Sequence, residues 1–153
     1  MSVAKGDRNK TRERLEVTEV LKGLCTYTIQ ICKNEKNFPK RDRWILTQHI
    51  VKEAVKAYTH AKKANAVEVM SEDDYRIRRR HQVKCRLNLE ALISLIEIAQ
   101  LVLSVEEDRV ENWAGYAVKA EQLLAAWRAS DRKRYRQLLT DETNQTQQQH
   151  PKG

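Results

Sequence analysis

The stretch Val110–Trp127, VENWAGYAVKAEQLLAAW, has the most regular apolar spacing in the chain. Its apolar side chains recur every three or four residues, which is the period of one face of an α-helix. The residues on that face are Val110, Trp113, Ala117, Ala120, Leu124 and Trp127. We therefore predict a helix here that buries one side against neighbouring helices.

The preceding apolar segment, residues 87–105, predicts a helix with apolar side chains around most of its circumference. Thirteen of its 19 residues are apolar, but Glu90 and Glu97 interrupt it, whereas a membrane span needs about 20 mostly uncharged residues. A helix buried on several sides is either central in the monomer or part of an interface between copies, and we favour self-association. The residues predicted for that interface are Leu89, Leu92, Ile93 and Ile96.

Two more helices are predicted nearer the N-terminus. One spans residues 14–36, with Val17, Val20, Leu21, Leu24, Thr28 and Ile31 on one face. The other runs from Pro39 or Lys40 to Ala66, because Pro39 ends one helix and suits the first turn of the next. Its two predicted stripes are Ile50, Ala54, Ala57, Ala61 and Ala64, and beside them Trp44, Val51, Val55 and Tyr58.

Helix starts are predicted where capping residues stand. Ser71, followed by three acids, begins a helix that ends near Leu103, and the segment 104–107 has the S-x-x-E form of a capping box. A further cap at Ser130-Asp131 predicts a short last helix ending near Leu139. The predicted organisation is a basic arm over 1–13, a helical domain over 14–139 and a disordered polar tail over 140–153.

Composition supports an all-α chain. Four Gly and two Pro among 153 residues are too few for a barrel or sandwich of many short strands, or for a glycine-rich phosphate loop. We predict an up-down-up-down bundle of four helices. Three cysteines without a C-x-x-C pair, and an N-terminus without an apolar core, favour a reducing cytoplasmic location with no membrane segment. No cofactor is expected.

The positive charge is concentrated in short segments. The net charge is +8, and segments 1–14, 37–43, 76–86 and 128–136 hold nineteen of the 29 Lys and Arg but only four of the 21 Asp and Glu. The rest of the chain therefore carries ten cations against seventeen acids. Such clustering is typical of proteins that bind nucleic acid.

Segment 76–86, RIRRRHQVKCR, is the strongest functional signal, with six cations and no acid. Helical spacing places several of these cations on one ridge, and Arg suits bidentate phosphate contacts. The alternative is a solvated face balanced by acids of a neighbouring helix. The predicted nucleic-acid-binding residues are Arg76, Arg79, Arg80, Lys84 and Arg86, with Lys40, Arg41 and Arg43 from the start of another helix.

Aromatic residues and histidines give weaker signals. The tryptophans keep helical period with aliphatic residues and are predicted to lie in the core, whereas Tyr75 and Tyr135 adjoin basic clusters and are candidates for base stacking. No two histidines are three or four residues apart, so no metal site is predicted. Cations after the helix over 110–127 are explained by its C-terminal dipole.

Three stretches resemble one family: CTYTIQICKNEKNFPKRDRWILTQHI, ANAVEVMSEDDYRIRRRHQVKCRLNLEALISLIEIAQ and VENWAGYAVKAEQLLAAWRASDRKRY. They are similar to the four-helix-bundle accessory variability proteins of diversity-generating retroelements, relatives of proteins encoded in ribosomal RNA intervening sequences. The resemblance covers residues 15–136. It implies a non-catalytic basic bundle that forms a pentameric barrel, binds template RNA (or DNA or an RNA–DNA hybrid) and a reverse transcriptase, and supports mutagenic cDNA synthesis.

Two other functions fit the sequence. Arg76 and His81 have the R-x4-H spacing of helical ribonucleases of the HEPN group, in which His acts as acid or base and Arg stabilises the transition state. Short motifs of this kind match readily by chance. The remaining alternative is a helical scaffold that binds only protein.

Overall fold

The computed structural model describes residues 5–139, and this part of the chain is helical without any strand. This confirms the predicted all-α class. The long helices are α1 (Lys5–Lys33), α2 (Gln48–Ala66), α3 (Glu72–Val102) and α4 (Glu107–Arg134), with a 3₁₀ turn, η1 (Lys40–Asp42), and a π turn, η2 (Arg43–Thr47), before α2. No helix among residues 5–139 has the length and hydropathy needed to cross a bilayer.

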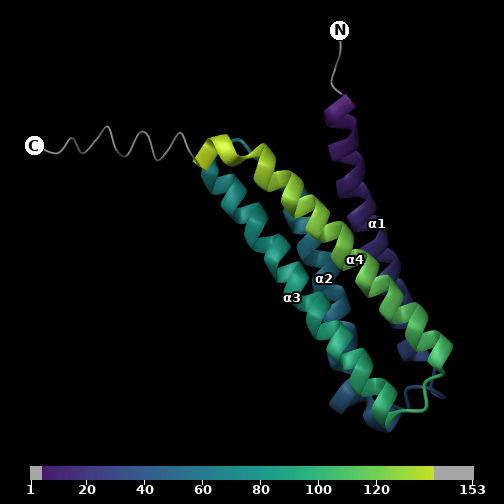
Figure 1. The fold of residues 1–153 in the computed structure, drawn as a ribbon. Helices are drawn as coiled ribbons and strands as arrows, with labels where there is room; N and C mark the ends of the chain where they lie inside the picture. Colours follow the sequence, from purple (N-terminus) through teal and green to yellow (C-terminus); the bar gives the residue numbers. More distant parts are fainter. Residues whose placement is uncertain (1–4, 140–153) are drawn as a thin grey trace, which may run out of the picture.

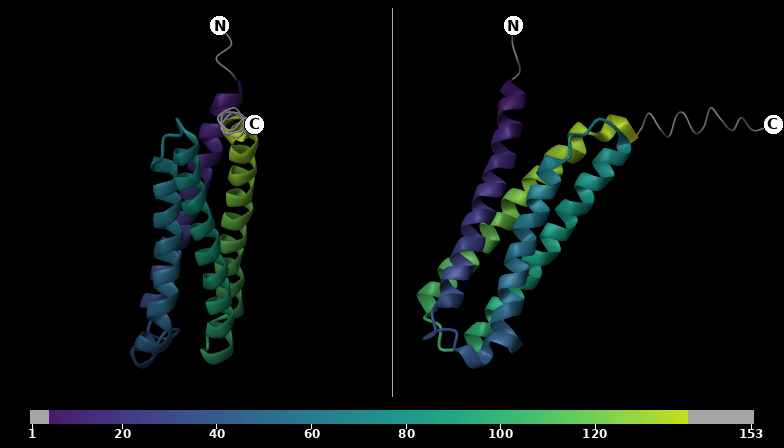
Figure 2. Two further views of the ribbon diagram at one scale, coloured as in Figure 1. Left: turned by 90° about the vertical axis from the view of Figure 1, so that its left-hand side faces the viewer. Right: turned by 180° about the vertical axis from the view of Figure 1, so that it is seen from behind.

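Consecutive long helices run in opposite directions and pack side by side (Figure 1). Both α1 and α3 contact α2 and α4, so the four helices surround a common core. The N-terminal part of α1 diverges from the other helices and extends beyond them (Figure 2). Helix α3 packs against α2 on one side and α4 on the other. Its remaining face is exposed to solvent.

The predicted face of α4 and the first predicted stripe of α2 are buried, whereas Val55 of the second stripe of α2 is 40% exposed. All six periodic residues of α4 lie in the core, and Trp113 and Trp127 are among its largest side chains. The first stripe of α2, with four alanines, is also buried, and such small side chains allow α3 to approach closely. The indole Nε1 of Trp113 donates to the Thr28 hydroxyl of α1 (2.9 Å), so this buried polar group is satisfied.

The boundaries of α1 differ from those predicted. The helix begins at Lys5 rather than Arg14 and ends at Lys33 rather than Lys36. Apolar periodicity starts only at Val17, but the charged residues before it are good helix formers and extend the helix without an apolar signal. Residues 1–4 and the tail predicted over 140–153 lie outside the described residues.

The start of the second helical segment is irregular, and this exposes Trp44. Hydrogen-bond spacing changes from 3₁₀ over Lys40–Asp42 to π over Arg43–Thr47 before regular α-helix begins. Each change rotates the following side chains away from the register of a continuous helix. Trp44 is 74% exposed, so its predicted place in the core is wrong.

Ser71 caps α3 as predicted. Its hydroxyl accepts a hydrogen bond from the Asp74 amide (3.2 Å), and the Asp74 carboxylate accepts from the amides of Met70 (3.0 Å) and Ser71 (3.1 Å). These bonds, with that from Met70 the strongest, hold the pKa of Asp74 below its ordinary value. The chain thus forms a reciprocal capping box at this corner.

The other two predicted caps are wrong. Helix α4 starts at Glu107, after an N-cap at Glu106 that makes no side-chain cap bond. Val105, just before that N-cap, is buried in the core. Asp131 does not start a new helix either. Asp131 lies inside α4 with 3% of its surface exposed. The predicted short last helix is nevertheless present, over residues 136–139 after a turn at Tyr135, so it starts later than predicted.

The residues predicted to join copies of the chain are mostly in its own core. Leu89, Leu92 and Ile96 are 0–1% exposed, because α2 and α4 cover α3 from both sides; their assignment to an interface is wrong. Ile93 is partly buried against the same core. The exposed apolar residues of α3 are Ile77, Leu87, Ile98, Leu101 and Val102.

Candidate nucleic-acid interface

One arginine of the basic run, Arg78, belongs to the core. It is 1% exposed, and its guanidinium donates to the carbonyl of Val67 (2.6 Å), the hydroxyl of Tyr135 (3.2 Å) and the carboxylate of Asp131 (3.4 Å). Gln82 donates to the other oxygen of Asp131 (2.9 Å). These bonds join α3, α4 and the loop between α2 and α3, so Arg78 has a structural role.

The tyrosines considered for base stacking lie beside this network. Tyr75 is 4% exposed and packs against Tyr135 with ring centroids 5.2 Å apart. A base has no access to the ring of Tyr75, so its prediction as a stacking platform is wrong. Tyr135 is half-buried and also faces the guanidinium groups of Arg78 and Arg134.

Four other cations of the run form an exposed ridge on α3. Arg76, Arg79, Arg80 and Lys84 line a shallow hollow of about 380 Å³ around Val83. Arg76 is paired with Glu72 one turn earlier. Arg79, Arg80 and Lys84 make no ion pair with any side chain that the structure describes, namely those of residue 14 and residues 16–139. The ridge therefore presents positive charge that the described part of the chain does not neutralise.

Helix α4 adds cations to the same side of the molecule. Burial lowers the pKa of Arg128, and the neighbouring charges of Arg86, Arg132 and Arg79 lower it further. Of these, Arg86 donates to Glu90 (2.9 Å). Arg86 and Arg128 also line one hollow between α3 and α4, which Glu90 and Glu121 line as well, so cations of both helices meet there with two acids beside them. We call the whole set the cationic face: Arg76, Arg79, Arg80, Lys84 and Arg86 of α3, with Arg128 and Arg132 of α4.

On its other side the ridge meets a pair of histidines. His60 of α2 and His81 of α3 are half-buried, and their Nδ1 atoms are 3.1 Å apart. Burial lowers the pKa of both imidazoles, and nearby cations, including Lys63 and Lys84, lower it further. Histidine spacing along the sequence does not predict this pair, because the two residues come from different helices and are 21 residues apart.

The second predicted basic group lies elsewhere. Lys40 pairs with Glu35 (3.3 Å), and the exposed Arg41 is 3.9 Å from Asp42. Turns η1 and η2 lie at the end of the molecule opposite the start of α3 (Figure 1). The structure therefore does not bring Lys40, Arg41 and Arg43 together with the ridge.

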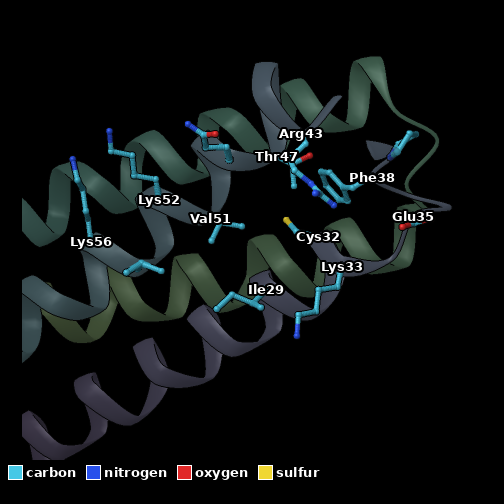
Figure 3. Close-up of a pocket in the computed structure, with 13 residues that line it drawn as sticks. Ile29, Cys32, Lys33, Glu35, Phe38, Arg43, Thr47, Val51, Lys52 and Lys56 are labelled. Carbon is cyan, nitrogen blue, oxygen red and sulfur yellow. The ribbon is translucent and has the colours of Figure 1, made fainter. Parts of the chain in front are cut away.

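Arg43 instead borders a groove between α1 and the start of α2 (Figure 3). This groove, which we call the α1–α2 groove, has a volume of about 760 Å³. Its apolar lining comprises Ile29, Cys32, Phe38, Pro39, Val51 and Val55, and its cations are Lys33, Arg43, Lys52 and Lys56. Burial raises the pKa of the Cys32 thiol to about 12, so this sulfur is a protonated, apolar part of the lining at neutral pH.

The R-x4-H pair does not converge within one chain. Five residues along an α-helix correspond to a rotation of about 140° between side chains. Arg76 is engaged with Glu72, whereas His81 turns towards His60. The two groups of the ribonuclease motif thus face different neighbours.

Comparison of the chain with protein-family models, curated proteins and solved structures finds no match in any of the three. The candidate sites therefore rest on the chain's own residues and their geometry.

Proposed function

We propose that this protein is a non-catalytic RNA-binding accessory protein that uses its cationic face to hold the RNA backbone. The observation that carries the proposal is the ridge of α3, on which Arg76, Arg79, Arg80 and Lys84 line one hollow and the last three have no acidic partner among the described side chains of residue 14 and residues 16–139. Phosphate contacts of this kind give affinity without requiring a particular base sequence.

The sequence resemblance supports a more specific assignment. We propose that the helices form the four-helix bundle of a retroelement accessory protein, which assembles as a pentamer and acts with a reverse transcriptase in the cytoplasm. Exposed apolar residues at the end of α3, Leu101 (85%) and Val102 (65%), support contact between copies. Removing such surface from water favours association.

A protein partner is supported by the α1–α2 groove. Its apolar lining between cations suits one face of an amphipathic helix that carries acids at its edges. We propose that such a segment of the reverse transcriptase occupies it. Binding that survives ribonuclease treatment and is lost on Val51→Glu would support this assignment. Unchanged binding by that variant would contradict it.

A salt titration tests the RNA proposal. For wild type binding a single-stranded RNA, log affinity should fall linearly with log salt, with a slope of roughly −0.7 for each phosphate contact. The triple variant Arg79→Ala, Arg80→Ala, Lys84→Ala should lose about 2 from that slope. A matched control removes three exposed cations outside the cationic face: Lys22→Ala, Lys36→Ala, Lys119→Ala.

Each result has a clear meaning. Affinity that is indifferent to salt, or equal effects of the two triple variants, would reject the cationic face as the binding site. RNA binding no stronger than binding of a neutral polymer would favour the protein-only scaffold. Cleavage of RNA that His81→Ala abolishes would establish the ribonuclease alternative. Competition with DNA and with an RNA–DNA hybrid of the same sequence identifies the preferred nucleic acid.

A further inference from the structure

The contact between His60 and His81 joins α2 and α3 beside the cationic face. The rings stack with centroids 5.3 Å apart and an interplanar angle of 25°. A separation of 3.1 Å between the Nδ1 atoms is a hydrogen-bond distance, so one imidazole donates its proton to the other. The opposite nitrogen of each ring, Nε2, is then not used in this bond.

The charged groups acting on the pair are all positive. Lys56 and Lys63 come from α2, and Arg80 and Lys84 come from α3. No acid is among the groups that shift either histidine. Positive charge on imidazole is therefore opposed in the free protein, and both rings have a pKa below the ordinary 6.5.

Such surroundings favour an anion over a metal cation. Two imidazoles alone leave a tetrahedral metal ion incomplete, and the described side chains, those of residue 14 and residues 16–139, include no cluster of three or more metal-ligating groups. Four cations around the pair also repel a metal ion. An anion meets complementary charge, together with imidazole N–H groups that can donate to it.

We propose that His60, His81, Lys63 and Lys84 form a phosphate-binding site that takes up a proton when it is filled. This inference rests on the proposed RNA-binding function, because the site adjoins the ridge at Arg80 and Lys84 and extends its reach onto α2. A phosphate held there supplies the negative charge that the pair lacks. It stabilises an imidazolium, which donates to the phosphate oxygens while its Nδ1–H still donates to the partner ring.

The expected consequence is an affinity for RNA that rises as pH falls. Because binding favours the protonated pair, affinity increases by up to about tenfold for each pH unit in which one proton is taken up. This dependence should lie between about pH 8 and pH 5.5, where histidine changes charge. Arginine and lysine contacts alone give no such dependence in that range.

RNA affinity is measured across this pH range at constant ionic strength, for wild type and for the double variant His60→Gln, His81→Gln. The control is His49→Gln, which replaces an exposed histidine of α2 outside the site. In parallel, the imidazole NMR signals of wild type are followed with inorganic phosphate and with chloride at equal ionic strength. Thermal unfolding of each variant verifies that it is folded.

The proposal expects wild type and His49→Gln to bind RNA more tightly at lower pH, and the double variant to lose that pH dependence. Phosphate should raise the apparent pKa of His60 and His81, and chloride should not. If phosphate acts on the pair while RNA affinity stays independent of pH, the ligand is free phosphate rather than the RNA backbone.

Two results separate this inference from the function on which it rests. RNA affinity that depends on salt but not on pH, with histidine signals indifferent to phosphate, overturns the site and leaves the RNA-binding proposal standing. Absence of RNA binding at every salt concentration overturns the proposed function. The phosphate titration then decides by itself whether the site exists.

Discussion

A single arginine shows how position within a run of cations decides a residue's role. Arg78 has the same sequence surroundings as Arg79 and Arg80, but it is buried and bonded to three groups. A buried charge is tolerated only with partners such as Asp131 and Val67. Its neighbours stay in water and are available to an anionic ligand.

Removing Arg78 should destabilise the fold much more than removing Arg79. Arg78→Ala leaves the Asp131 carboxylate buried, with the Gln82 amide still donating to it, and breaking a buried pair costs about 3–5 kcal/mol. Arg79→Ala should change the free energy of unfolding by about 0.5 kcal/mol or less. Urea unfolding measures both values.

A double variant identifies the source of that loss. If the cost comes from an uncompensated charge, Arg78→Met with Asp131→Leu should be more stable than the sum of the single changes predicts. Additive effects would contradict a coupling between the two side chains.

At the scale of elements, helix ends decide which side chains reach solvent. The cap at Ser71 could be read from the sequence because its partner Asp74 is three residues away. The start of α4 could not, since its N-cap Glu106 makes no side-chain cap bond that a local motif would predict. Likewise, no local sequence pattern predicts the π turn over Arg43–Thr47, in which Trp44 is exposed.

The capping carboxylate of Asp74 should make the free energy of unfolding depend on pH in the acid range. Hydrogen bonds lower the pKa of Asp74 in the folded protein from the ordinary 3.8. Its contribution is therefore present above about pH 4 and is lost as pH falls through the lower folded-state pKa. The difference in unfolding free energy between wild type and Asp74→Asn should shrink over that interval. A constant difference from neutral pH to acid would contradict the charge-assisted cap.

The irregular start of the second helical segment predicts one solvent-accessible tryptophan. Trp44 is 74% exposed, whereas Trp113 and Trp127 are 0–1% exposed. Acrylamide should quench one fraction of the tryptophan fluorescence readily, and Trp44→Phe should remove that fraction. Trp127→Phe is the control and should leave it in place. Quenching that Trp44→Phe does not alter would mean that this side chain is covered.

At the scale of the molecule, packing combines short signals into surfaces. Arg128 of α4, whose position the helix dipole explains locally, lines the same hollow as Arg86 of α3 and so enlarges the cationic face. Conversely, α3 has apolar side chains around most of its circumference because many of them are buried between α2 and α4. Of the apolar residues that α3 leaves exposed, Leu101 and Val102 at its end are the most exposed, above Ile77, Leu87 and Ile98.

Self-association should therefore depend on the end of α3. We expect light scattering to give a mass above that of one chain, and Leu101→Glu with Val102→Glu to lower it, because charges in an apolar contact are costly. Met70→Glu is the control, since Met70 is 77% exposed at the other end of α3. A monomeric wild type would contradict the proposed assembly, whereas equal loss with the control would place the contact elsewhere.

The sequence by itself determined the helical class, the buried alanine stripe of α2, the buried face of α4 and the cap at Ser71, because these depend on residues at most a few turns apart. Only the tertiary structure decided that Arg78 pairs with Asp131, 53 residues away, and that His60 meets His81, 21 residues away. Contacts of this kind depend on which helices pack together and at what rotation. Helical periodicity predicts which face of each helix is buried, but it does not predict which other helix packs against that face. Contact partners that are distant in sequence can therefore be identified only from the packed structure.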